Sequence, residues 1–147
     1  PYLDKRQECK DRAVDRLKGC RDSMESSGIP IDNLEVIPTT YYLKRGGDAF
    51  EDFMTRTPRP TVIMCGNDVL ATGALIRANE MGIKVPDEVS VTGFDDIDLA
   101  EVIKPNLTTV HVPHRRMGES AALLLLDILD DKKDCQSVEL ETEIVIR

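Results

Sequence analysis

The chain has 147 residues, of which 41% are apolar and 31% are charged, the composition of an ordinary soluble globular protein. This length allows one domain, or one lobe of a larger domain. The formal net charge of −8 argues against a nucleic-acid-binding surface in this piece, because phosphate contacts require a basic patch.

Two helices and a strand are predicted in the first part of the chain. In order, they are a helix from Lys5 to Ser26, a strand from Leu34 to Ile37 and a helix from Gly46 to Thr57. Asp4 can cap the first helix, whose apolar side chains recur about every 3.6 residues, and Gly28 followed by Pro30 ends it. The loop before the second helix carries Tyr41 and Tyr42.

The stretch from Pro60 to Asp96 has the pattern of a βαβ unit. It predicts a strand from Thr61 to Cys65, a helix from Val69 to Met81 and a strand from Val89 to Thr92. Two short buried strands joined through a helix should be parallel, with a right-handed crossover. Ligands bind outside the carboxyl ends of such strands. Polar pairs stand at both ends: Asn67 with Asp68, and Asp95 with Asp96.

The rest of the chain adds a helical turn, an extended segment, a helix and a strand. These are expected at Asp98 to Ile103, Leu107 to Val112, His114 to Leu129 and Val138 to Ile146. The last segment alternates apolar and acidic side chains, which is typical of a strand with one solvated face. The whole order predicts an open, mainly parallel α/β sheet flanked by helices.

Each candidate site residue has a structural explanation beside a functional one. Asn67 and Asp68 can simply cap the helix, or one can cap while the other faces a ligand. Asp95 lies nearest a strand end, where a carboxylate suits sugar hydroxyls or a ring N–H, although the acidic cluster can also be a solvated loop or hold Mg²⁺. Arg16 stands among charged residues of a solvent face. Tyr41 can anchor its loop or stack on a ligand.

Catalytic and metal motifs are weak or absent. His111 and His114, with Pro113 between them, are poorly spaced for a helical metal pair. The sequence has no nucleophile elbow, Walker A motif or dinucleotide-binding fingerprint, so neither an enzyme nor a cofactor is expected. No apolar run is long enough for a membrane span. The four cysteines form no CxxC pair, and free thiols favour the cytoplasm.

An ordered set of short motifs runs along the chain. They are Arg16-Leu17-Lys18-Gly19, Cys65-Gly66-Asn67-Asp68, Gly82-Ile83-x-Val85-Pro86, Val89-Ser90-Val91-x-Gly93-Phe94-Asp95-Asp96 and Pro105-x-Leu107-Thr108-Thr109. Together these motifs resemble the effector-binding domain of the LacI/GalR family of bacterial transcription regulators. The resemblance implies the periplasmic binding protein-like fold, in which two α/β lobes enclose a ligand. Family members are usually homodimers, and the ligand changes the affinity of a separate N-terminal helix-turn-helix for operator DNA.

The resemblance also implies roles for residues and segments. Arg16, Asn67 and Asp95 would contact the effector, and Tyr41 would form an aromatic wall, or Tyr42 if the loop register shifts by one. Residues 1–111 would be the C-terminal lobe without its first strand, and residues 112–147 a crossover, helix and strand belonging mainly to the N-terminal lobe.

Three functions therefore stay open. The first is an effector-sensing domain, with a sugar as the first expectation and a nucleobase or a phosphorylated metabolite as alternatives. The second is a periplasmic-type sugar-binding protein that feeds a transporter. The third is an enzyme that uses Asp95 with Mg²⁺.

Overall fold

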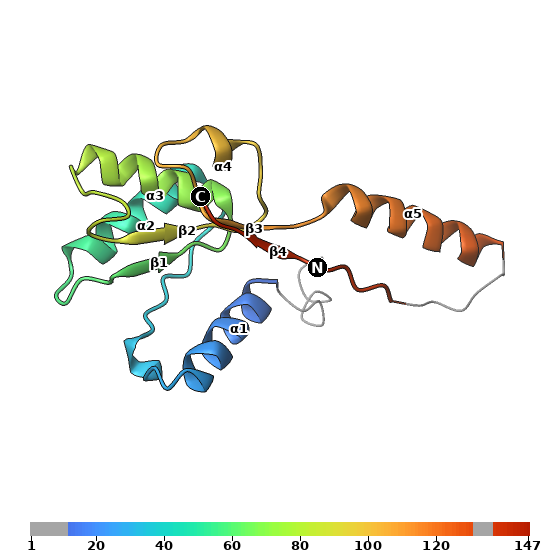
Figure 1. Cartoon of the computed structure of the whole chain (residues 1–147), viewed down its shortest axis with the longest axis horizontal. Helices are drawn as coiled ribbons and strands as arrows, with labels where there is room; N and C mark the ends of the chain where they lie inside the picture. The colour runs from blue at the N-terminus through green and yellow to red at the C-terminus, as the bar shows by residue number, and fades with distance from the viewer. Residues whose placement is uncertain (1–11, 131–136) are drawn as a thin grey trace, which may run out of the picture. The chain divides into compact units, whose positions relative to one another are not determined.

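A computed structural model describes residues 12–130 and 137–147 of the chain (Figure 1). The chain divides into two compact units, with the boundary between Thr40 and Tyr41, and each unit is described by itself. The predicted cap at Asp4 and the first turns of the predicted N-terminal helix lie outside the described residues.

The first unit contains helix α1 (Arg12–Ser26) and the short helix η1 (Ile31–Asn33). Gly28 has φ +70°, and the N–H of Ile29 donates to the carbonyl of Met24 at 2.9 Å, so the predicted helix end is confirmed. The predicted strand from Leu34 to Ile37 is wrong. A strand is stable only where its backbone groups pair with a neighbour, and no described strand pairs with this segment.

The second unit follows the predicted order of helices and strands. Its elements are α2 (Leu43–Thr55), β1 (Val62–Met64), α3 (Asp68–Glu80), β2 (Ser90–Thr92), α4 (Leu99–Val102), β3 (Thr109–His111), α5 (His114–Leu129) and β4 (Glu143–Val145). The helix predicted from His114 to Leu129 has the observed bounds. The predicted βαβ unit is also present, since β1 and β2 are parallel with Ile63 opposite Val91.

The last strand is shorter than the prediction. Strand β4 pairs antiparallel with β3, and Glu143 lies opposite His111. Because Pro113 follows closely after β3, the residues before Glu143 have no partner strand to pair with. Single parallel bridges at Thr92–Thr108 and Asp95–His111 place β3 beside the β2 segment.

Helices α2 and α3 pack against each other and cover one face of β1 and β2 (Figure 1). The core that they form includes Phe50, Met54, Ile63, Ala71, Ala74, Leu75, Ala78, Val89, Val91 and Leu107. Gly46 and Gly73 stand where the two helix backbones approach most closely, because a Cβ at either position would overlap the carbonyl of the facing helix. This close packing fixes the start of α3 relative to the start of α2.

Candidate functional site

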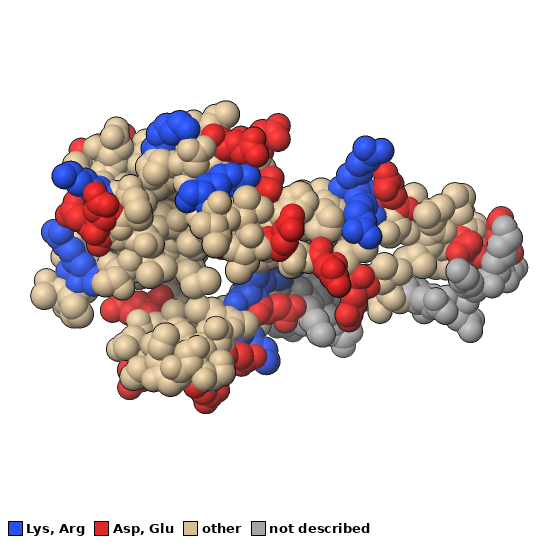
Figure 2. Space-filling view, in the orientation of Figure 1, with Lys and Arg blue, Asp and Glu red and all other residues tan. Residues whose placement is uncertain are grey.

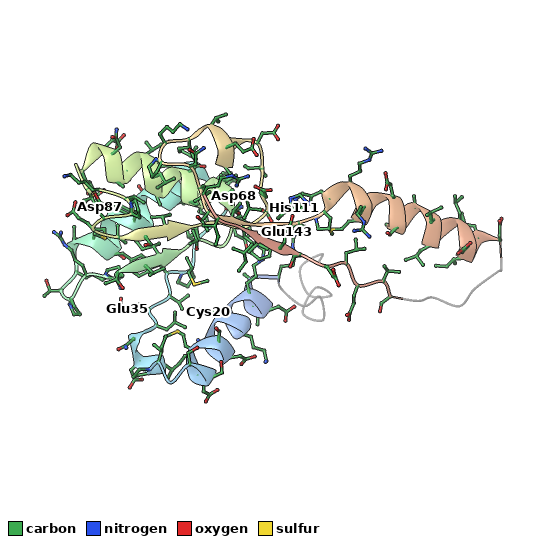
Figure 3. All side chains as sticks on the ribbon, in the orientation of Figure 1. Cys20, Glu35, Asp68, Asp87, His111 and Glu143 are labelled. Carbon is green, nitrogen blue, oxygen red and sulfur yellow. The ribbon has the colours of Figure 1, made fainter. Side chains whose placement is uncertain are left out.

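The loops that follow β1 and β2 touch each other at the carboxyl ends of these strands. The N–H of Cys65 donates to the carbonyl of Thr92 at 2.8 Å, and the N–H of Asp68 donates to the carbonyl of Phe94 at 2.9 Å. In Figure 3, Asp68 and His111 lie at this end of the sheet, and Asp87, in the turn before β2, lies at the other. The loops that carry the two polar pairs therefore meet at one edge of the sheet, as the parallel arrangement of the strands predicts.

Asn67 caps helix α3. Its Oδ1 accepts a hydrogen bond from the N–H of Leu70 at 2.9 Å, which satisfies one of the donors exposed at a helix start. The side chain is half-buried, and its Nδ2 amide donates no hydrogen bond within the described part of the chain. One end of this side chain is thus structural, and the other keeps two N–H donors for a ligand.

Asp68 is buried and serves as a brace for the neighbouring loop. Its side chain is 1% exposed, and its two oxygens accept hydrogen bonds from Thr109 Oγ1 at 2.6 Å and from the N–H of Ile97 at 2.9 Å. Gly93 lies against the same carboxylate, where a Cβ would overlap it. The expectation that one of Asn67 and Asp68 faces a ligand therefore cannot apply to Asp68. No local pattern in the sequence signals these bonds, because Thr109 in β3 and Ile97 in the loop after β2 lie far from Asp68 along the chain.

Asp95 and Asp96 form a backbone turn of unusual geometry. Their φ angles are 111° and 54°, a region that non-glycine residues rarely occupy. The N–H of Asp95 donates to the carbonyl of Val110 at 3.0 Å, and its carbonyl lies 3.3 Å from His114 Nε2. The side chain of Asp95 is half-buried at the strand end, the position predicted for it.

Asp96 is an ion-pair partner, so the solvated-loop alternative is wrong for this residue. Its Oδ2 lies 2.9 Å from His111 Nδ1, and its Oδ1 lies 2.8 Å from Arg147 Nη2. Burial raises the pKa of Asp96, but the hydrogen bonds and charges of Arg147 and His111 oppose this effect and hold the pKa below its ordinary value. Nothing in the sequence signalled this pairing, because Arg147 lies far along the chain.

The two other predicted contact residues differ in what the structure says about them. Tyr41 lies beside the turn that leads into α3, since its Cε1 is 3.5 Å from the position of a Cβ on Gly66. The residue is 47% exposed, so part of its side chain is accessible to solvent. Tyr42 is more exposed and is the N-cap residue that precedes α2. Arg16 belongs to the first unit, where it is half-buried on α1. The ligand contacts that the family resemblance assigns to Arg16, Tyr41, Asn67 and Asp95 stay predictions.

Other features of the described residues limit the chemistry. Burial, with a smaller effect from the charge of Asp68, raises the pKa of the Cys65 thiol to about 12, so it is protonated at neutral pH. Among residues 12–130 and 137–147, no three His, Cys, Asp or Glu side chains are grouped to hold a metal ion. No helix in those ranges is long and apolar enough to cross a membrane. On the face in Figure 2, basic and acidic side chains are interspersed.

A pocket of about 270 Å³ lies away from the predicted contact residues. Its lining includes Val85, Thr92, Thr108 and Arg147, and none of Arg16, Tyr41, Asn67 or Asp95.

Comparison with known proteins identifies relatives along nearly the whole chain. Residues 4–147 match the periplasmic binding protein-like domain. The HTH-type transcriptional repressor PurR of Photobacterium profundum is 36% identical over 139 residues, which are 94% of this chain and 42% of that protein.

Two similar solved structures hold sugars. The LacI family transcriptional regulator from Enterococcus faecium with bound ribose has a TM-score of 0.85 at 30% identity, over 92% of this chain and 50% of that one. The transcriptional regulator CelR in complex with cellobiose has a TM-score of 0.84 at 29% identity, over 91% of this chain and 41% of that one. The chain spans half or less of the length of these relatives.

Proposed function

We propose that this chain, which belongs to the periplasmic binding protein-like domain family, is the effector-sensing part of a LacI-type transcriptional regulator. One observation carries the proposal. Three side chains that the family resemblance assigns to the effector, those of Tyr41, Asn67 and Asp95, come from loops gathered at the carboxyl end of β1 and β2. Ligands bind parallel α/β sheets at that end.

A sugar fits the chemistry of this edge. The Nδ2 amide of Asn67 can donate to a hydroxyl, and the carboxylate of Asp95 can accept from one or two hydroxyls. The partly exposed ring of Tyr41 can offer an apolar wall. The ligand contact that the family resemblance assigns to Arg16, which belongs to the first unit, stays a prediction. Relatives solved with ribose and cellobiose favour a sugar over the nucleobase and phosphorylated-metabolite alternatives.

The effector would act by binding two arrangements of the lobes unequally, since a ligand of equal affinity shifts nothing. In this proposal residues 1–111 belong to the C-terminal lobe, and residues 112–147 cross to the N-terminal lobe. Operator DNA would be bound only by a helix-turn-helix outside this chain, and the regulator would be cytoplasmic. The transporter-feeding alternative is not favoured, because the named relatives are transcriptional regulators. No catalytic role is proposed.

The exposed apolar side chains of helix α5 give a second, separate reason to expect a protein partner. None of its residues is buried, and its exposed apolar side chains include Met117, Leu123, Leu125, Leu126 and Leu129. Exposed apolar surface of this extent usually marks a protein–protein contact. We expect the 147-residue chain to self-associate through this helix at high concentration, as the full regulator would form homodimers. Light scattering that detects only monomers would contradict the expected association.

A thermal-shift screen of the full-length regulator tests the proposed effector binding. The ligands are ribose, cellobiose, sugar phosphates and the purine bases adenine and guanine. A ligand at 100 times its Kd should add about 2.7 kcal/mol of stability. Asp95→Ala should abolish the shift, and Asp98→Asn, at an exposed position three residues further on, should keep it. If no ligand shifts the wild-type protein, the effector proposal fails.

A further inference from the structure

The loop of residues 94–97, called the ligand loop here, depends on outside contacts for its shape. Asp95 and Asp96 both have positive φ angles. Such backbone conformations persist in non-glycine residues only where the surrounding structure holds them. The candidate effector contact at Asp95 is therefore positioned by whatever fixes the rest of the loop.

The side chain of Asp96 supplies two of these fixing contacts. Its Oδ2 accepts from His111 Nδ1 at 2.9 Å, and its Oδ1 pairs with Arg147 Nη2 at 2.8 Å. The side chains of Asp96 and Arg147 are each only 14% exposed, so this pair is much better shielded from water than a surface ion pair. His111 is 43% exposed.

One partner of Asp96, His111, ends strand β3, and the other, Arg147, lies two residues beyond the end of strand β4. His111 is the last residue of β3, and residues 112–113 connect it to α5. Arg147 follows β4, which brings the chain back and pairs with β3. One carboxylate thus links the ligand loop to the end of β3 and to the chain just beyond β4.

We propose that Asp96 couples the ligand loop to β3 and β4, so that a ligand held by Asp95 constrains both of these strands. The inference rests on the proposed effector function of this edge. Asp96 acts as a positioning residue, because its carboxylate is occupied by His111 and Arg147. Coupling of this kind needs a contiguous physical link between the site and the moving part, and the Asp96 side chain provides one.

Arg147 makes contacts besides the one with Asp96, so substituting Asp96 tests the link with less effect on the rest of the structure. Its Nη2 also lies 3.2 Å from a carboxylate oxygen of Glu101, and its Nη1 donates to the carbonyl of Leu107 at 3.1 Å. In Asp96→Asn the arginine therefore keeps two partners and its place beside β3. The ligand loop alone loses its charged link.

Hydrogen exchange on the full chain without ligand tests the link directly. In Asp96→Asn, amides of residues 94–97 and 109–111 should exchange about tenfold faster than in the wild type, a change of about 1.4 kcal/mol in opening. Amides of α2 and α3 should be unchanged, which shows that the variant is folded. Asp98→Asn is the matched control and should behave as wild type. Unchanged exchange in residues 109–111 of folded Asp96→Asn would overturn the proposal.

A second variant and a ligand separate the inference from the proposed function. Arg147→Gln should accelerate hydrogen exchange at the same amides. The double variant with Asp96→Asn should exchange little faster than either single variant, because both substitutions remove the same ion pair. In the full-length regulator, ribose or cellobiose should protect residues 94–97 and 109–111 in the wild type but only 94–97 in Asp96→Asn. Equal protection in both proteins would refute the coupling. If neither sugar changes exchange in the wild type, sugar sensing fails, and the ligand-free comparison still decides the role of Asp96.

Discussion

Replacing Asp68 with alanine should destabilise the protein far more than replacing it with asparagine. The side chain is 1% exposed and accepts hydrogen bonds from Thr109 Oγ1 and from the N–H of Ile97. Asp68→Ala leaves both donors in a buried place without an acceptor. Because each unsatisfied buried group costs about 1–3 kcal/mol, the expected loss of unfolding free energy is about 3–5 kcal/mol.

Asp68→Asn can keep both hydrogen bonds by orienting its amide. Oδ1 can accept from the N–H of Ile97 while Nδ2 donates to the hydroxyl of Thr109, since a hydroxyl both donates and accepts. Only the negative charge of the side chain is lost. Its loss weakens the hydrogen bonds that the side chain accepts and removes an anion from the first turn of α3, where the helix dipole favours one. The expected cost is roughly 1–2 kcal/mol.

Urea unfolding of the full chain, analysed by linear extrapolation, measures both values. Thr109→Val provides the matched check. Because Thr109→Val and Asp68→Asn act on the same hydrogen bond, the two substitutions together should cost less than the sum of the single ones. An Asp68→Ala protein as stable as Asp68→Asn would refute the hydrogen-bond reasoning, and additive effects of Asp68→Asn and Thr109→Val would refute the shared hydrogen bond.

Three further predictions concern packing, acid and thiol chemistry. Gly73→Ala should cost about 2–3 kcal/mol in urea unfolding, because a methyl group overlaps the α2 backbone, whereas Gly118→Ala has open space and should be neutral or stabilising. The lowered pKa of Asp96 means that its stabilisation is complete above its ordinary pKa and is lost as pH falls through the lowered one. The urea midpoint should therefore fall below about pH 4, by less in Asp96→Asn. The Cys65 thiol should resist iodoacetamide at pH 8 in the folded chain, and rapid alkylation there would contradict its burial.

The central βαβ unit was predictable because each of its signals is local. Short β-branched runs mark the strands, Asn67 caps the helix, and Gly82 ends it with a φ of +69°. The α5 helix was equally readable from its periodicity. The start of α2 was not, because a glycine such as Gly46 is more typical of a helix boundary than of a helix interior. The observed helix begins at Leu43, since close packing on α3 requires glycine inside it.

The candidate site was predictable only in outline. The residues at the strand ends could be named because parallel strands align their carboxyl ends, and the structure gathers Tyr41, Asn67 and Asp95 there. The supporting partners could not be named. The bonds from Asp68 to Thr109 and from Asp96 to Arg147 join segments that meet only through tertiary structure. No periodicity or capping rule reports such contacts.

Calorimetric titration of the full-length regulator with ribose or cellobiose tests the central claim most directly. Asn67→Ser keeps a capping oxygen for α3 but removes the amide donors, so it should retain the wild-type melting temperature. It should weaken sugar binding at least about tenfold, the loss of roughly one good hydrogen bond. Asp95→Ala should abolish measurable binding. Wild-type sugar affinity in both variants would contradict a ligand site at this edge of the sheet.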